Sequence, residues 1–217
     1  MKPQDLKYPF AWEERRPLLD RGVLFVPRYY FLHRCPVLFD RVAPIHLEYC
    51  SGHGHWIVER AKKHPAYNWI AVEKRFERVR KIWSKKCNEQ VDNLLIVHGD
   101  AETFTEFYLS DDSVDHMYIN FPDPWPKTKH AHHRLFKQPF IGQMARALKK
   151  GGISTMVTDD ALWAERIHEA MENSWQPVFP PPFYVTEWEN YGSSYFDALW
   201  RKQGRTIHYL QFQPSAV

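Results

Sequence analysis

From Pro44 onward, short apolar runs alternate with longer stretches in which apolar residues recur at helical spacing. Runs of about five or six apolar residues predict buried strands, and amphipathic stretches of about ten residues or more predict helices that cover them. The strands of this part are predicted over residues 45–50, 68–73, 94–98, 116–121 and 153–158. The helices are predicted over residues 55–64, 75–88, 101–109, 134–149 and 160–174.

This alternation ends at a proline-rich break formed by Pro177 and residues 180–182. Two further strands are predicted near residues 183–188 and 205–212, and no helix is expected between them, so they should pair antiparallel. Strands that alternate with helices favour a mostly parallel sheet with helices on both faces. The sequence therefore predicts an α/β, Rossmann-like fold with a seven-stranded, mostly parallel sheet.

The domain organisation is predicted from composition. Residues 1–22 are polar and contain proline, which is typical of a flexible N-terminal arm, and residues 23–217 are expected to form a single domain. No secretory leader and no apolar stretch long enough for a membrane span is recognised. The three cysteines are too few and too scattered for a disulfide framework, so we expect a cytoplasmic protein.

Four predicted strands end in, or lead directly to, a carboxylate: Glu48, Glu73, Asp100 and Asp123. A solvated loop or a helix cap is the more common role for any one such acid. Four acids in the same register are harder to dismiss, because ligands of open α/β sheets bind outside the carboxyl ends of the strands. This edge is the predicted ligand site.

The loop after the first of these strands contains Gly52 and Gly54, which allow a tight turn and a close approach to a ligand. The third glycine of a dinucleotide-binding motif is missing, because position 57 is Ile. A carboxylate-rich site would also repel a pyrophosphate. The pattern favours a cationic nucleoside, S-adenosylmethionine, over NAD.

Three of the four acids have a predicted role toward that cofactor. Glu73 is placed to accept hydrogen bonds from ribose hydroxyls, and Asp100 from the exocyclic amine of adenine. Glu48 can attract the ammonium group of the methionine moiety and a nearby sulfonium. Asn120, at the end of the fourth strand, completes the predicted cofactor-binding set.

The segment after the fourth strand is the most informative part of the chain. Prolines at 122, 124 and 126 stiffen the loop around Asp123 and Trp125. A basic run follows, and Trp125 either stacks on a base or braces the loop. His130, His132 and His133 have no carboxylate or Cys at matched spacing nearby, so no metal is predicted.

At this segment the chain resembles the bacterial tRNA (guanine-N7-)-methyltransferases. The family hallmark stands here as Phe121-Pro122-Asp123-Pro124-Trp125 with Lys127, and the resemblance extends from about residue 23 to residue 212. Further matching elements are Leu47-Glu48 with Gly52 and Gly54, Ala71-Val72-Glu73, residues 98–101, Thr158-Asp159 and residues 186–189. Cys50 departs from the family, which usually has glycine there, and it would be strained if the loop needs a positive φ.

The resemblance implies a class I S-adenosylmethionine-dependent methyltransferase that modifies N7 of a guanine in the variable loop of tRNA. It places Asp123 at the catalytic centre and Lys127 in contact with the RNA. It also places Asp159, Thr186 and Glu189 at the substrate. A second role remains open for Asp159, which could cap the helix over 160–174. The expected partner is tRNA, and the enzyme could be a monomer or a homodimer.

Charge is consistent with an RNA substrate without identifying one. The net charge is only +3, but basic residues are concentrated in the helix over 75–88 and in the run after Trp125. Two alternatives stay open: an amino-group methyltransferase and an RNA-binding scaffold that has lost catalysis. The first is disfavoured because Asn120-Phe121-Pro122 lacks the adjacent proline pair of that class.

Overall fold

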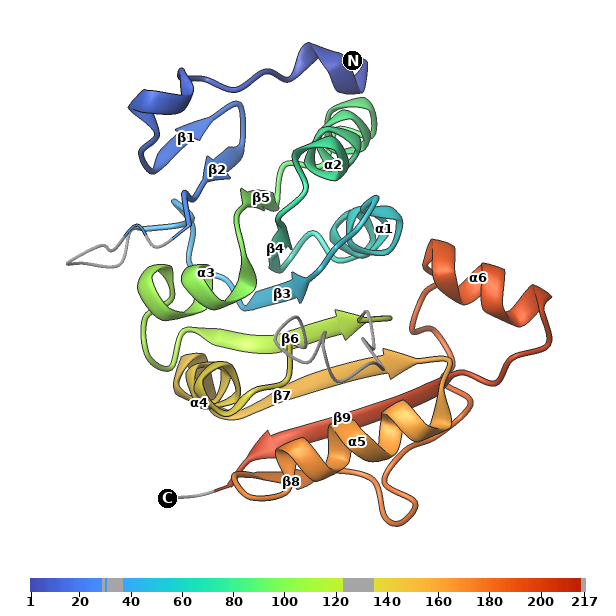
Figure 1. Cartoon of the computed structure of the whole chain (residues 1–217). Helices are drawn as coiled ribbons and strands as arrows, with labels where there is room; N and C mark the ends of the chain where they lie inside the picture. The colour runs from blue at the N-terminus through green and yellow to red at the C-terminus, as the bar shows by residue number, and fades with distance from the viewer. Residues whose placement is uncertain (29, 31–36, 123–134, 216–217) are drawn as a thin grey trace. The chain divides into compact units, whose positions relative to one another are not determined.

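The computed structural model describes residues 1–28, 30, 37–122 and 135–215 (Figure 1). The chain divides into two compact units, Met1–Ser110 and Asp111–Val217. Each unit contains both strands and helices. The prediction of one methyltransferase domain over residues 23–217 stays a prediction.

The sheet of the first unit has the strand order β1-β2-β5-β4-β3. Three neighbouring strands in this order are parallel: β3 (Ile45–Tyr49), β4 (Asn68–Glu73) and β5 (Leu94–His98). All six residues of β4 are buried, as expected for a strand covered on both faces. The predictions for these three strands are confirmed to within one residue.

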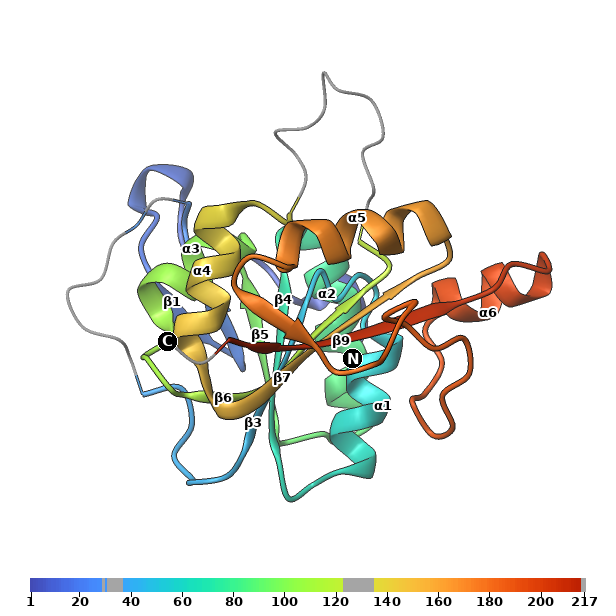
Figure 2. The same ribbon diagram turned by 90° about the horizontal axis from the view of Figure 1, so that it is seen from below.

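Helices α1 (His55–Lys63) and α2 (Phe76–Asn88) follow β3 and β4, and α3 (Ala101–Tyr108) follows β5. Helices α1 and α2 lie on one face of this sheet and α3 lies on the other (Figures 1 and 2). Helix α2 buries Val79, Ile82 and Trp83, the apolar positions whose spacing predicts it. Parallel strands joined by helices bring all three strand ends to one edge.

The N-terminal residues pack on this unit, although their composition suggests a flexible arm over residues 1–22. Short 3-10 turns, η1 (Pro3–Asp5) and η2 (Trp12–Glu14), precede strands β1 (Leu18–Asp20) and β2 (Val23–Phe25). The side chain of Leu6 is fully buried. Arg80 and Ser84 of α2 donate hydrogen bonds to the carbonyls of Leu6 and Met1 at 2.9 and 2.7 Å.

The sheet of the second unit has the order β6-β7-β9-β8. Strands β6 (Val114–Asn120) and β7 (Leu148–Thr158) are parallel, whereas β9 (His208–Pro214) runs antiparallel to β7 and to β8 (Trp175–Pro177). Helices α4 (Gln138–Ala147) and α5 (Ala161–Met171) lie on the same face of this sheet (Figure 2). A third helix, α6 (Tyr195–Lys202), precedes β9.

The predicted count of seven strands is wrong, because the described residues contain nine. Strands β1, β2 and β8 have three residues each, which is too short for a recognisable pattern. The strand predicted over 183–188 is replaced by a single antiparallel bridge between Val185 and Tyr209. The pairing partner of β9 is therefore β7 on one side and β8 on the other.

Candidate cofactor and substrate sites

Three of the four predicted acids lie at the carboxyl edge of the first unit's sheet. Glu48 is the next-to-last residue of β3, Glu73 ends β4, and Asp100 follows β5 by two residues. The three strands are direct parallel neighbours, so the three acids occupy adjacent positions along one edge. Glu48 and Glu73 are each only 3% exposed. The fourth acid, Asp123, lies outside the described residues.

The loop between β3 and α1 has the backbone conformation that its glycines allow. The φ angles of Cys50, Gly52 and Gly54 are 58°, 55° and 73°, all in the left-handed region. A Cβ at Gly54 would lie 2.8 Å from Cγ1 of Ile82, so glycine is needed there for space as well as for conformation. Cys50 is therefore strained, because a residue other than glycine is disfavoured at this positive φ.

Glu73 holds this loop in place. Its Oε2 accepts a hydrogen bond from the backbone N–H of Gly52 at 3.0 Å, and its Oε1 accepts one from the N–H of Arg75 at 2.8 Å. The guanidinium of Arg78 lies 3.6 Å from Oε2. An ionised carboxylate has about four lone-pair positions, so Glu73 keeps capacity for the two hydroxyls of a ribose.

The two carboxylate oxygens of Asp100 differ: one caps a helix, and the other is available to a ligand. Its Oδ1 caps α3 by accepting the N–H of Thr103 at 2.8 Å. Its Oδ2 is buried and has no hydrogen-bond partner among the described residues. A buried acceptor of this kind is expected to be satisfied by a ligand donor. This oxygen fits the exocyclic amine of adenine, and the three acids together fit a cationic nucleoside.

Two lysines of α2 contact the loop between β3 and α1. Nζ of Lys85 donates to the carbonyl of His53 at 2.6 Å, and Nζ of Lys81 lies 3.3 Å from Nε2 of the same residue. Burial, together with the nearby charge of Lys81, lowers the pKa of Lys85 to about 8. Burial also lowers the pKa of His53. Two lysines of the basic helix predicted over 75–88 thus contact the loop between β3 and α1.

In the second unit, Asn120 ends β6 and is nearly buried. Its Oδ1 accepts a hydrogen bond from the hydroxyl of Tyr191 at 2.6 Å, so this contact fixes the orientation of its amide. Asn120 is the residue of the second unit that we assigned to the cofactor. Lys127, like Asp123 and Trp125, lies outside the described residues.

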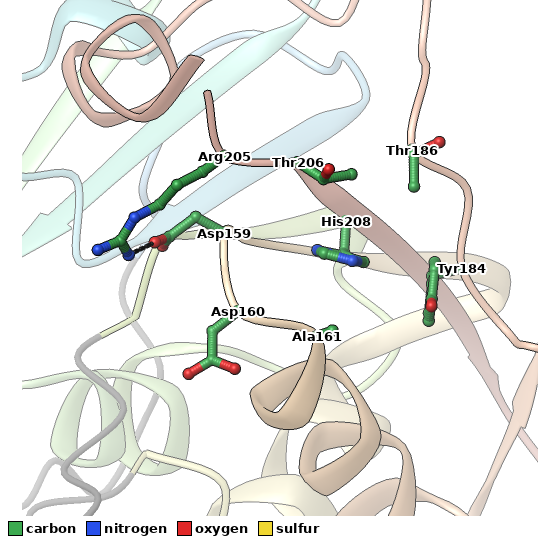
Figure 3. A pocket seen from close by; sticks show the side chains of 8 residues that line it. All are labelled: Asp159, Asp160, Ala161, Tyr184, Thr186, Arg205, Thr206 and His208. Atoms are coloured by element: carbon green, nitrogen blue, oxygen red, sulfur yellow. Dashed lines mark hydrogen bonds and ion pairs between the residues drawn. The ribbon is translucent and has the colours of Figure 1, made fainter. Parts of the chain in front are cut away.

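A hollow of about 600 Å³ opens beside the end of β7 (Figure 3). Asp159 lines it and forms an ion pair with Arg205, and the two side chains point toward one another in Figure 3. The capping role left open for Asp159 belongs to its neighbour: Asp160 accepts hydrogen bonds from Leu162 and Trp163 at 2.9 and 3.2 Å. Asp159 is therefore not needed to cap α5.

Thr186, which the family resemblance places at the substrate, also lines this hollow, whereas Glu189 is exposed and is not one of its lining residues. Sequence reasoning missed Arg205, Tyr184 and His208, which line the same hollow. The rings of Tyr184 and His208 meet edge to face at 4.7 Å. The sequence carries no signal for these three residues, because all of them fall inside the strands predicted near 183–188 and 205–212.

The described residues contain neither a metal-binding cluster nor a membrane-spanning helix. No group of three or more His, Cys, Asp or Glu side chains is arranged to hold a metal ion. None of the helices in that part of the chain has the length and apolar character needed to cross a bilayer. The histidines at 130, 132 and 133 lie outside the described residues.

Comparison with known proteins agrees with this geometry. Solved structures with the same fold include a 16S rRNA methyltransferase, KamB (TM-score 0.60, 16% identity, 80% of this chain and 88% of that chain). Another is a SAM-dependent methyltransferase from Aquifex aeolicus (TM-score 0.55, 12% identity, 78% and 81% covered). The fold is that of the class I S-adenosylmethionine-dependent methyltransferases.

The family is shown by sequence. A model described as putative methyltransferase matches residues 42–208. A tRNA (guanine-N(7)-)-methyltransferase of Chlamydia muridarum is 47% identical over 98% of this chain and 97% of its own length. The corresponding protein of Chlamydia pneumoniae is 44% identical with the same coverage. The chain belongs to the tRNA (guanine-N7-)-methyltransferase family.

Proposed function

We propose that this protein transfers a methyl group from S-adenosylmethionine to N7 of a guanine in the variable loop of tRNA. The observation that carries the proposal is the alignment of Glu48, Glu73 and Asp100 at one sheet edge, in a chain whose near-full-length relatives bear that name. Family membership supports the substrate, and the carboxylate edge supports the cofactor.

When bound, S-adenosylmethionine supplies a methyl group activated by its sulfonium charge. Glu73 binds the ribose hydroxyls with the lone pairs that Gly52 and Arg75 leave available. Asp100 accepts the adenine amine with its buried Oδ2. Glu48, which is almost fully buried, attracts the cationic methionine end.

The remaining requirement is to place and hold the guanine. N7 carries an in-plane lone pair, so no proton has to leave before it attacks, and positioning and electrostatics dominate the rate enhancement. Asp123 accepts from the N1–H and N2 amine of an unstacked guanine, and this contact strengthens as positive charge grows on the ring. Adenine lacks these donors, which accounts for the choice of base. Lys127, Asp159, Thr186 and Glu189 bind the RNA around it.

The test is the identity of the methylated nucleoside. Transfer RNA is incubated with the enzyme and S-adenosylmethionine carrying a labelled methyl group, then digested and separated. N7-methylguanosine is the expected labelled product. A labelled N6-methyladenosine would favour an amino-methyltransferase, and no label together with intact RNA binding would favour a scaffold without catalysis.

The variant Asp123→Ala isolates the proposed catalytic contact. We expect methyl transfer to fall at least about a hundredfold, since loss of one group that stabilises the transition state has this effect. Binding of tRNA should change little, because phosphates contribute most of the affinity. Single-turnover rates and a filter-binding titration measure the two quantities. A variant that keeps most of its turnover removes Asp123 from the mechanism.

A further inference from the structure

Helix α6 is attached to its unit by charged and polar groups rather than by an apolar face. Its one buried residue is Asp197. Asp197 accepts hydrogen bonds from Ser193 at 3.1 Å and from Arg201 at 3.0 Å, and Arg201 donates to the hydroxyl of Tyr209 in β9 at 2.9 Å. A surface helix usually buries its apolar stripe against the core. Here the inward side is polar, so the apolar stripe is turned outward.

The outward side of α6 is aromatic. The ring of Phe196 is 39% exposed, and the ring of Trp200, one helical turn away, is half-buried. The two rings are almost parallel, with centroids 6.3 Å apart and planes at 19°. Exposed aromatic side chains in contact with each other mark interaction surfaces more often than single exposed ones. Phe196 and Trp200 are called the α6 aromatic face below.

Cations surround this face and connect it to the hollow. Arg201 and Lys202 end α6 and are exposed. The guanidinium of Arg205 lies 4.1 Å from the centroid of the Trp200 ring and also pairs with Asp159, which lines the hollow. One arginine therefore bridges the α6 aromatic face and the proposed substrate residues. Aromatic rings interleaved with arginine are the arrangement on which single-stranded nucleic acid stacks.

We propose that the α6 aromatic face is a stacking platform for an unstacked nucleotide of the RNA substrate, adjacent to the nucleotide that reaches Asp159. This inference rests on the proposed function, because it assumes an RNA substrate. Phe196 stacks on the base, and Lys202 and Arg205 contact the neighbouring phosphates. Unstacked bases in loops are the parts of folded RNA that proteins read by stacking.

A nucleotide fits this face better than a second copy of the chain. A helix of eight residues is only about 12 Å long, too short to supply the roughly 800 Å² that each partner buries in a stable complex. A second copy placed symmetrically would also bring two sets of cations together. Phosphates, in contrast, complement these charges.

The test uses Phe196→Ala, Phe196→Tyr and a matched control, Val178→Ala. Val178 is also an exposed apolar residue of the second unit, at 43% against 39% for Phe196. We expect Phe196→Ala to raise the KM and the Kd for tRNA about tenfold, as loss of one base–aromatic stack does. Phe196→Tyr and Val178→Ala should match the wild type. The kcat at saturating tRNA and the Kd for S-adenosylmethionine should be unchanged in all three.

Several outcomes would overturn the platform. Phe196→Ala with wild-type KM and Kd for tRNA is one, and a loss of thermal stability that accounts for a weaker Kd is another. A change of oligomeric state in sedimentation would assign the face to a second copy. The proposed function fails differently: the wild type itself then yields no N7-methylguanosine. In that case the Kd of Phe196→Ala for tRNA still shows whether Phe196 contributes to RNA binding. A wild type that binds no tRNA overturns the platform too.

Discussion

The carboxylates of the two units are held in different ways. In the first unit, Glu73 accepts two backbone N–H groups and Asp100 accepts one as a helix cap. In the second unit, Asp159 is held by Arg205, whose side chain is 49% exposed. The backbone donors cannot move without deforming the loop, whereas an exposed arginine can rotate away.

This difference matches what each region is proposed to bind. A small cofactor of constant shape is best bound by a rigid, preorganised edge, because little conformational freedom is then lost on binding. A large RNA must dock before a base can enter its pocket, and groups held by exposed ion pairs can exchange partners as it does so. The carboxylate edge of the first unit is therefore the rigid region, and the Asp159–Arg205 pair of the second unit is the adjustable region.

The largest effect is expected for Gly54→Ala in the cofactor loop. The new Cβ would meet Ile82 at 2.8 Å in a backbone with φ of 73°, so steric and conformational strain add. We expect a loss of about 3 kcal/mol in the free energy of unfolding, measured by chemical denaturation.

Two other glycines separate the contributions. Gly151→Ala has positive φ but open space, and should lose about 1 kcal/mol from strain alone. Gly142→Ala has neither problem and lies in α4, so it should gain up to about 1 kcal/mol. Equal losses at Gly54 and Gly151 would show that the loop is not tightly packed against α2.

Arg205→Ala tests the adjustable region. Removing the partner of Asp159 should raise the KM for tRNA about fivefold, which corresponds to the roughly 1 kcal/mol that an exposed ion pair contributes. The control is Arg146→Ala, which breaks a comparable pair with Asp111 at 2.5 Å, away from the hollow. If steady-state kinetics give the same KM for both variants, Asp159 does not depend on Arg205.

Cys50→Gly should stabilise the loop. Cysteine at φ of 58° carries about 1 kcal/mol or more of strain, and the extra freedom of glycine in the unfolded chain offsets part of it. A net gain of about 0.5 kcal/mol is expected by thermal denaturation, with S-adenosylmethionine bound at least as tightly. A destabilised variant would mean that the thiol makes a contact worth more than the strain.

The last prediction concerns pH. The pKa of Lys85 is lowered to about 8 in the folded protein, because burial disfavours the charged amine. The unfolded chain then binds more protons between that value and the ordinary pKa of lysine near 10.5, so stability should rise with pH in this window. Lys85→Met should lose that rise. A dimethyl-lysine NMR titration showing Lys85 near 10.5 would contradict the burial of this amine.

The central elements could be predicted from the sequence because their signals are local. Helix α2 and strand β4 follow regular apolar spacing, and the strand-end acids follow from that register. Helix α6 could not be predicted in this way, since its buried residue is an aspartate and its aromatic residues face outward. Prediction from apolar periodicity assumes that the apolar residues of a helix face the core and its polar residues face solvent.

The substrate side was predicted less completely for a different reason. The pairing of Asp159 with Arg205 joins residues 46 positions apart and depends on the turn before β9. The capping of α5 by Asp160 rather than Asp159 depends on a shift of one residue, which no pattern resolves. The contacts of Lys81 and Lys85 with the ring and the carbonyl of His53 could not be predicted either, because charge alone does not show which group a lysine faces.

The most direct test of the account is a calorimetric titration of S-adenosylmethionine into the wild type, Glu73→Gln and Glu77→Gln. Glu77 is the matched control, four residues along and 83% exposed. We expect one site per chain in the wild type and no change in Glu77→Gln. In Glu73→Gln we expect a Kd about 10- to 100-fold weaker, because charged hydrogen bonds are lost. Wild-type affinity in Glu73→Gln would contradict the carboxylate edge as the cofactor site.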